Sequence, residues 1–173
     1  MKIRLLFTLA FLSIGAQLLA QLGTGSIAFV GFNADGDDDF AFVIFDSIPP
    51  STNIIFCDSE WDGQQLGNDE GDFTWNSGAN GISPGTIVSV LSGSQTINPS
   101  IGNITVNNAG GFSSGSEAIF AFQGTSPRTV SIMLAAISNS ASGFGTLNNT
   151  GLIAGLTAIV LPEGVDIAEY KGA

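Results

Sequence analysis

Oxygen-bearing side chains gather in one short acidic segment between two apolar runs of the chain. They alternate along the segment, as Asn33, Asp35, Asp37 and Asp39, and Gly36 allows the backbone to bend tightly between them. Calcium takes about 6–8 oxygen ligands, and carboxylate and amide oxygens on a tight turn converge on such an ion. The spacing therefore predicts a Ca2+ site in this turn.

A second acidic segment begins with Asp58 and Glu60, directly after another apolar run. These two carboxylates complete the metal site if the fold brings the two segments together. The pattern departs from an EF-hand loop, because no Glu stands at the twelfth position and strand-like runs flank the turn. The alternative is a solvated, charged hairpin tip that protects sheet edges from aggregation.

Two tryptophans fall inside the second acidic segment, Trp61 with Asp62 beside it and Trp75 further along. Exposed indole rings next to carboxylates would form a surface that stacks on a sugar or contacts a protein ligand. The alternative is that both rings plug one end of the core beneath a long loop. The sequence leaves both interpretations open.

The same segment holds carboxylates that a glycosidase could pair, one protonated and the other ionised. They are Asp58, Glu60, Asp62, Asp69, Glu70 and Asp72. Histidine is absent from all 173 residues, which removes His-based zinc sites and imidazole-activated nucleophiles. The sequence therefore favours a non-enzymatic protein, with a carboxylate-based extracellular hydrolase as the alternative.

Residues 1–20 are typical of a secretory signal peptide. Lys2 and Arg4 precede the apolar stretch from Leu5 to Ile14, and Ala20 stands at the expected cleavage point. The apolar stretch is shorter than the roughly 20 residues that span a bilayer. We therefore expect a secreted or cell-surface protein without a membrane segment after cleavage. Residues 21–173 would form a single domain, either free-standing or the N-terminal module of a longer protein.

The charge balance of residues 21–173 limits the partners of this domain. Only Arg128 and Lys171 of the four basic residues remain beside all 15 acidic residues, which gives a net charge of −13. Such a chain repels nucleic-acid phosphates and anionic lipid, which excludes both as direct partners. Cys57 is the only cysteine, and its apolar neighbours predict a buried structural thiol.

Short β-rich runs alternate with Gly, Asn, Ser and Pro along residues 21–173, and this spacing favours an all-β sandwich or barrel. The run from Phe40 carries large residues on both faces, as expected for a strand between a core and a covering layer. The predicted strands are Ser26–Phe32, Phe40–Asp46, Asn53–Cys57, Thr86–Leu91, Ile101–Asn107, Ser116–Gln123, Thr129–Ile137 and Thr157–Leu161.

The run Ile27–Val43 resembles the start of a domain in secreted bacterial proteins, often large multidomain surface proteins. Further segments similar to that domain are Ile55–Gly63, Gly71–Trp75, Ile82–Val88 and Leu152–Leu161. The order of acidic turn, Trp segment and Pro-Gly-Thr before a strand is distantly similar to lamin-tail-type domains. This second resemblance implies an immunoglobulin-like antiparallel β-sandwich, here with about eight strands. The signal peptide resembles those of Bacteroidetes that export surface proteins through a type IX system.

These observations together predict a secreted, non-enzymatic binding or structural module at the cell surface, stabilised by calcium. Its partner would be a glycan, a protein ligand or a neighbouring domain of a longer chain. The resemblance adds one alternative, because such modules accompany extracellular nuclease or esterase domains.

Overall fold

The computed structural model describes residues 21–36, 38–93, 96–108, 116–126 and 128–172. The predicted signal peptide and Asp37 of the acidic turn lie outside the described residues. Within them every regular element is a β-strand, which confirms the all-β prediction. None of these residues forms a helix long and apolar enough to cross a membrane.

Eleven strands occur in the described part of the chain, rather than about eight. They are β1 (Ile27–Asn33), β2 (Asp39–Ile44), β3 (Asn53–Cys57), β4 (Asp72–Asn76), β5 (Ile87–Gly93), β6 (Thr96–Pro99), β7 (Asn103–Asn108), β8 (Ala118–Ser126), β9 (Thr129–Ser138), β10 (Ala158–Val160) and β11 (Ile167–Glu169). The additions to the predicted set are β4, β6 and β11.

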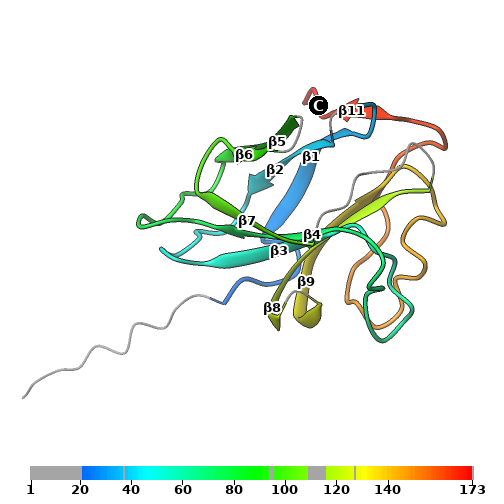
Figure 1. Ribbon diagram of the computed structural model, residues 1–173, viewed down its shortest axis with the longest axis horizontal. Helices are drawn as coiled ribbons and strands as arrows, with labels where there is room; N and C mark the ends of the chain where they lie inside the picture. The colour runs from blue at the N-terminus through cyan, green and yellow to red at the C-terminus, as the bar shows by residue number, and fades with distance from the viewer. Residues whose placement is uncertain (1–20, 37, 94–95, 109–115, 127, 173) are drawn as a thin grey trace, which may run out of the picture.

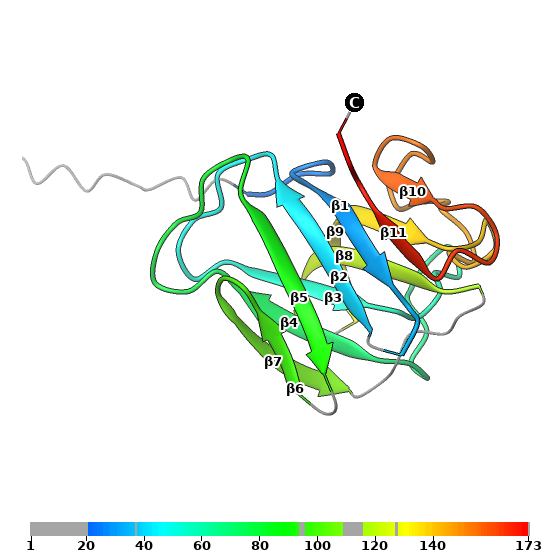
Figure 2. The same ribbon diagram turned by 90° about the horizontal axis from the view of Figure 1, so that it is seen from above.

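The strands form two sheets packed face to face, which confirms the predicted β-sandwich (Figures 1 and 2). The first sheet has the order β11-β1-β2-β5-β6, and the second has the order β10-β9-β8-β3-β4-β7. Neighbouring strands run antiparallel, apart from the parallel pair β9 and β10. The chain passes between the sheets after β2, β4, β6 and β10, so residues distant in sequence meet across the core.

Alternating side chains decide which face of each strand is buried. In β2, Phe40, Phe42 and Ile44 point into the sandwich and are almost completely buried, while Ala41 and Val43 face outward. This alternation gives the first sheet an inner face that packs on the second sheet and an outer face that none of the described strands covers.

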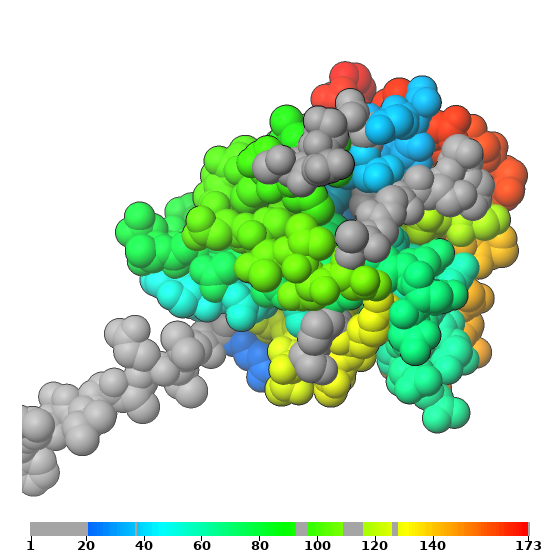
Figure 3. Space-filling model, in the orientation of Figure 1, coloured from blue at the N-terminus to red at the C-terminus, as the bar shows by residue number. Residues whose placement is uncertain are grey.

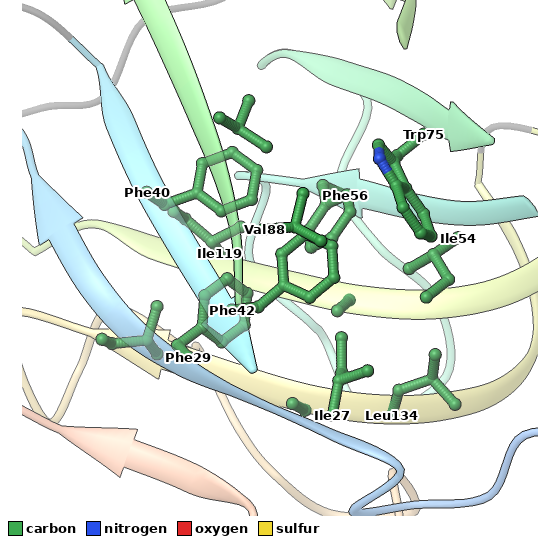
Figure 4. Packing of buried hydrophobic residues seen from close by; sticks show 14 of the residues in the cluster. Ile27, Phe29, Phe40, Phe42, Ile54, Phe56, Trp75, Val88, Ile119 and Leu134 are labelled. Carbon is green, nitrogen blue, oxygen red and sulfur yellow. The ribbon is translucent and has the colours of Figure 1, made fainter. Parts of the chain in front are cut away.

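Aromatic rings fill the space between the sheets (Figure 4). Phe56 of β3 lies against Phe40 and Phe42 of β2, at ring-centroid distances of 4.9 and 5.2 Å. Trp75 of β4 is fully buried beside them, and its indole Nε1 donates a 2.7 Å hydrogen bond to the carbonyl of Ile101. Gly102, directly before β7, adopts a φ of 83° against this indole, where a Cβ would collide.

Candidate functional site

The loop between β3 and β4, residues 58–71, carries most of the acidic side chains of the second sheet. Its ends are held together because Cys57 pairs with Asp72 in the ladder and the amide of Asp58 donates to the carbonyl of Gly71. The strand alternation turns Phe56 toward the core, and Cys57 with Asp72 toward the outer face. Asp58 and Asp72 therefore lie at the mouth of the loop.

Trp61 anchors this loop to the segment that follows β9. The Trp61 ring is 6% exposed, and its Nε1 donates a 2.9 Å hydrogen bond to the carbonyl of Asn148. Backbone hydrogen bonds join Trp61 to Phe144 and Thr146 as well. Figure 1 shows the loop beside residues 139–157, and in Figure 3 it forms a protrusion at the lower right.

Arg128 joins the loop from the tip of the β8–β9 hairpin. Its Nη1 donates to Ser59 Oγ at 2.8 Å and to the carbonyl of Gly67. Its Nη2 donates to the carbonyl of Glu70 at 2.6 Å and forms an ion pair with Asp72 Oδ1 at 3.2 Å. One guanidinium thus ties both ends and the middle of the loop together.

The β8–β9 hairpin is irregular, and this irregularity explains how Arg128 reaches the loop. Three register shifts interrupt the pairing, between Ala121 and Phe122 and at two points around Gly124. Extra residues of this kind bend a strand pair and increase its twist. We infer that the bend carries the hairpin tip over the outer face of β3, where Nη1 of Arg128 also lies 3.5 Å from Cys57 Sγ.

Asp58 and Glu70 are two carboxyl groups whose surroundings disfavour the ionised form. Asp58 is 5% exposed, and burial raises its pKa to about 7, with repulsion from Glu70 adding to the effect and Arg128 opposing it. The pKa of Glu70 is also raised, first by burial and then by repulsion from Glu60 and Asp69. The loop therefore concentrates negative charge that a single arginine balances only in part.

Cys57 is confirmed as a buried thiol, with 1% of its surface exposed. Burial raises its pKa to about 11, although hydrogen bonds with Ser59 and the charge of Arg128 act in the opposite direction. The thiol is therefore protonated near neutral pH, and it is not an activated nucleophile.

The acidic turn that predicts calcium forms the tip of the β1–β2 hairpin. Asn33 pairs with Asp39 at the ends of the two strands, and Gly36 has a φ of 84°. Asn33 Oδ1 accepts a 2.9 Å hydrogen bond from the amide of Asp35, while Asp39 Oδ1 accepts a 2.7 Å bond from the amide of Ser92. These oxygens thus support the backbone. Asp37, the remaining predicted ligand, lies outside the described residues.

The other predicted metal ligands are Asp58, which is buried at the mouth of the loop, and Glu60, which is exposed on it. No group of three acidic or cysteine side chains in the described residues is arranged as a ready coordination shell. Among the described residues, the β1–β2 turn and the β3–β4 loop thus do not form one preformed metal site.

The predicted ligand surface consists of Trp61, Asp62 and Trp75, and its two indole rings are not exposed for stacking on a ligand. Both indole rings are buried in the two hydrophobic clusters, as in the alternative in which they plug the core. Asp62 is exposed, and its carboxylate accepts hydrogen bonds from the amides of Gln64 and Gln65, which lower its pKa. Trp61 and Asp62 therefore shape the loop, and Trp75 belongs to the core between the sheets.

Sequence reasoning did not identify Arg128 as the centre of the loop. A signal was present, because Arg128 is one of only two basic residues in a domain with 15 acidic ones. A cation in such a chain is expected to have carboxylate partners, but nothing local to Arg128 shows which ones.

Replacing Asp58 with Asn should flatten the dependence of stability on pH. With its pKa raised from 3.8 to about 7 on folding, Asp58 binds its proton more tightly in the native state. Its contribution to the free energy of unfolding is therefore full below about pH 4 and falls as pH rises toward 7. At about 1.4 kcal/mol per pKa unit, the fall is at most about 4 kcal/mol, reduced by solvent near the loop.

Urea unfolding between pH 4 and 8, with chelator present, measures this effect as the difference between the variant and the native protein. The difference should grow in favour of Asp58→Asn as pH rises, and then level off above about pH 7. A difference that does not vary with pH would show that Asp58 is ionised normally. Asp62→Asn, in the same loop but exposed, is the matched control.

The chain matches no protein-family model, no curated protein and no solved structure.

Proposed function

We propose that the chain is a secreted, non-enzymatic module of the immunoglobulin-like class, and that it serves as a binding or structural unit at the cell surface. The two antiparallel-rich sheets, the repeated passage of the chain between them and the resemblance of Ile27–Val43 to bacterial surface-protein domains support this class. The signal-peptide pattern of residues 1–20 supports export.

The observation that carries the proposal is the apolar outer face of the first sheet, the nearer layer in Figure 2. Phe45, Ile87 and Leu91 are 56%, 55% and 55% exposed on or next to β2 and β5. Phe45 and Ile87 border a shallow groove of about 520 Å³ together with Val30 and Val43. Contiguous apolar surface of this kind marks an interaction site in a folded domain.

The chemistry of this face favours a protein partner over a glycan. The polar side chains that line the groove are few, namely Ser89, Glu169 and Tyr170. Sugar recognition relies on exposed rings and many hydrogen-bonding groups, and both tryptophans of the domain are buried. The domain has a net charge of −13, but only one carboxylate lines this groove. The face therefore suits an apolar protein surface, such as that of a neighbouring domain.

Substitution of Val43→Lys together with Ile87→Glu tests this face. The two residues are directly paired across β2 and β5, so the new charges face each other and the net charge is unchanged. We expect the free energy of unfolding to change by less than about 1 kcal/mol. Fractionation of producing cells should find the native protein in the surface fraction and the variant in the medium.

Val106→Lys with Ile153→Glu is the matched control, because both side chains are exposed and lie away from the groove. This control should stay at the surface. Equal retention of the native protein and the Val43/Ile87 variant would contradict the proposed use of the face. Recovery of the native protein inside the cell, with residues 1–20 attached, would contradict secretion.

A carboxylate-based hydrolase is the second candidate, because Asp58 has a raised pKa and stands beside Glu70. A glycosidase needs such an acid together with an ionised partner. The 5% exposure of Asp58 restricts the approach of a substrate, which is why we rank this function second. Release of reducing sugar from a glycan by the native protein, lost in Asp58→Asn, would favour the hydrolase.

A further inference from the structure

Three buried carboxylate oxygens around the β3–β4 loop have no hydrogen-bond partner among the described residues. They are Asp58 Oδ1, Glu70 Oε2 and Asp72 Oδ2. Asp58 and Asp72 are 5% and 1% exposed, so water does not solvate these oxygens freely. Folded proteins rarely leave buried polar groups unpaired, because each one loses its hydration without compensation. Three such oxygens around one loop are left to find a partner outside the described residues.

The charges of the loop point to a cation. Arg128 directs one hydrogen bond to a carboxylate oxygen of the site, Asp72 Oδ1, and its other contacts reach carbonyls, a hydroxyl and a thiol. Asp58 and Glu70 repel each other, so in their ionised forms the three carboxylates and Arg128 leave two negative charges. A divalent cation would balance that charge and give the free oxygens a partner.

We propose that the β3–β4 loop binds a calcium ion through the free oxygens of Asp58, Glu70 and Asp72. Calcium fits because it accepts irregular arrangements of 6–8 oxygen ligands, whereas magnesium demands near-ideal octahedral geometry. Zinc does not fit, because the chain has no histidine and a single cysteine, so it cannot supply the nitrogen and sulfur ligands that zinc prefers. The site lies on the second sheet and is independent of the apolar face in the proposed function.

Glu70 is the least buried of the three proposed ligands. Its side chain is only partly buried, and the exposed carboxylates of Glu60 and Asp69 stand close enough to raise its pKa. Because the three ligands do not yet form a ready shell, an arriving ion would draw Glu70 toward the fixed oxygens of Asp58 and Asp72. Glu60 and Asp69 would then attract the ion from the rim and leave water to fill the remaining ligand positions.

Thermal unfolding of the purified protein at pH 8, in millimolar calcium and in chelator, tests the proposal. Calcium should raise the midpoint of unfolding by mass action, with a dissociation constant of about 10⁻⁴ to 10⁻³ M, as in extracellular calcium modules. Magnesium at the same concentration should have little effect. The double variant Asp58→Asn with Glu70→Gln should lose the shift while keeping the native circular-dichroism spectrum.

The matched control removes the same charge from the hairpin tip, as Asp35→Asn with Asp39→Asn. This control should keep the calcium shift. Terbium luminescence excited through Trp61, which lies in the same loop, provides a second readout that does not depend on stability. No shift with the native protein, or loss of the shift in the hairpin variant, would overturn the proposal. Either result leaves the test of the apolar face unaffected.

Discussion

Replacing Arg128 with methionine should lower the free energy of unfolding by about 3–5 kcal/mol, the usual cost of removing one partner of a buried ion pair. Asp72, whose side chain is 2% exposed, would lose the one counter-charge that the described residues give it. The carbonyls of Gly67 and Glu70 would lose their donor in the same step. Equilibrium unfolding in urea at pH 7 measures the loss.

Two further variants separate the ion pair from general effects of losing an arginine. Arg128→Met combined with Asp72→Asn should cost less than the sum of the two single changes, because the stranded carboxylate is gone. Lys171→Met removes the exposed partner of Glu169 and should cost less than about 1 kcal/mol. A loss below about 1 kcal/mol in Arg128→Met would show that the guanidinium does not hold the loop.

Phe56→Ala should cost about 3–5 kcal/mol, as do other truncations of large buried aromatic side chains. Phe56 has no exposed surface, and its ring contacts Phe29, Phe40, Phe42 and Phe73 from both sheets. Truncation would leave a cavity in the middle of the sandwich, where the surrounding strands collapse only in part. A domain whose total stability is about 5–15 kcal/mol would be close to unfolding at physiological temperature.

Phe45→Ala is the natural comparison for this core truncation. The Phe45 ring is 56% exposed beside the apolar outer face, so its loss should change stability by less than about 1 kcal/mol. Thermal and urea unfolding of both variants measure the contrast. Comparable losses in the two variants would mean that the inner aromatic cluster does not dominate the stability of the sandwich.

Much of the fold could be predicted from local sequence pattern. Asn53–Cys57 is predicted with the bounds that β3 has, and Phe40–Asp46 overlaps nearly all of β2. The strand β4 is absent from the prediction because its five residues begin with an Asp and stand between Gly-rich segments. Phe73 and Trp75 alternate along β4 and are both buried, but this pattern can be recognised only once the face that they share is known.

The site was less predictable, because its parts come from different regions of the chain. The acidic residues of the β3–β4 loop can be read directly, but Arg128 is 56 residues away from Asp72 in sequence. No local spacing encodes such a contact, and the register shifts that bend the β8–β9 hairpin have no clear sequence mark. Burial of both tryptophans likewise depends on segments that pack on them, such as the carbonyl of Asn148 that receives the Trp61 hydrogen bond.

The pairing of β11 with β1 also has a mechanical consequence. The two strands run antiparallel, with Asn33 opposite Ile167 and Gly31 opposite Glu169. The chain therefore enters β1 and leaves β11 at the same end of this ladder. Tension applied to the chain before β1 and after β11 would act at this one end of the ladder. It would break the hydrogen bonds one after another instead of loading all of them together. Under a steady pull, β11 would peel away at low force and expose the edge of β1, while the aromatic interior stayed closed.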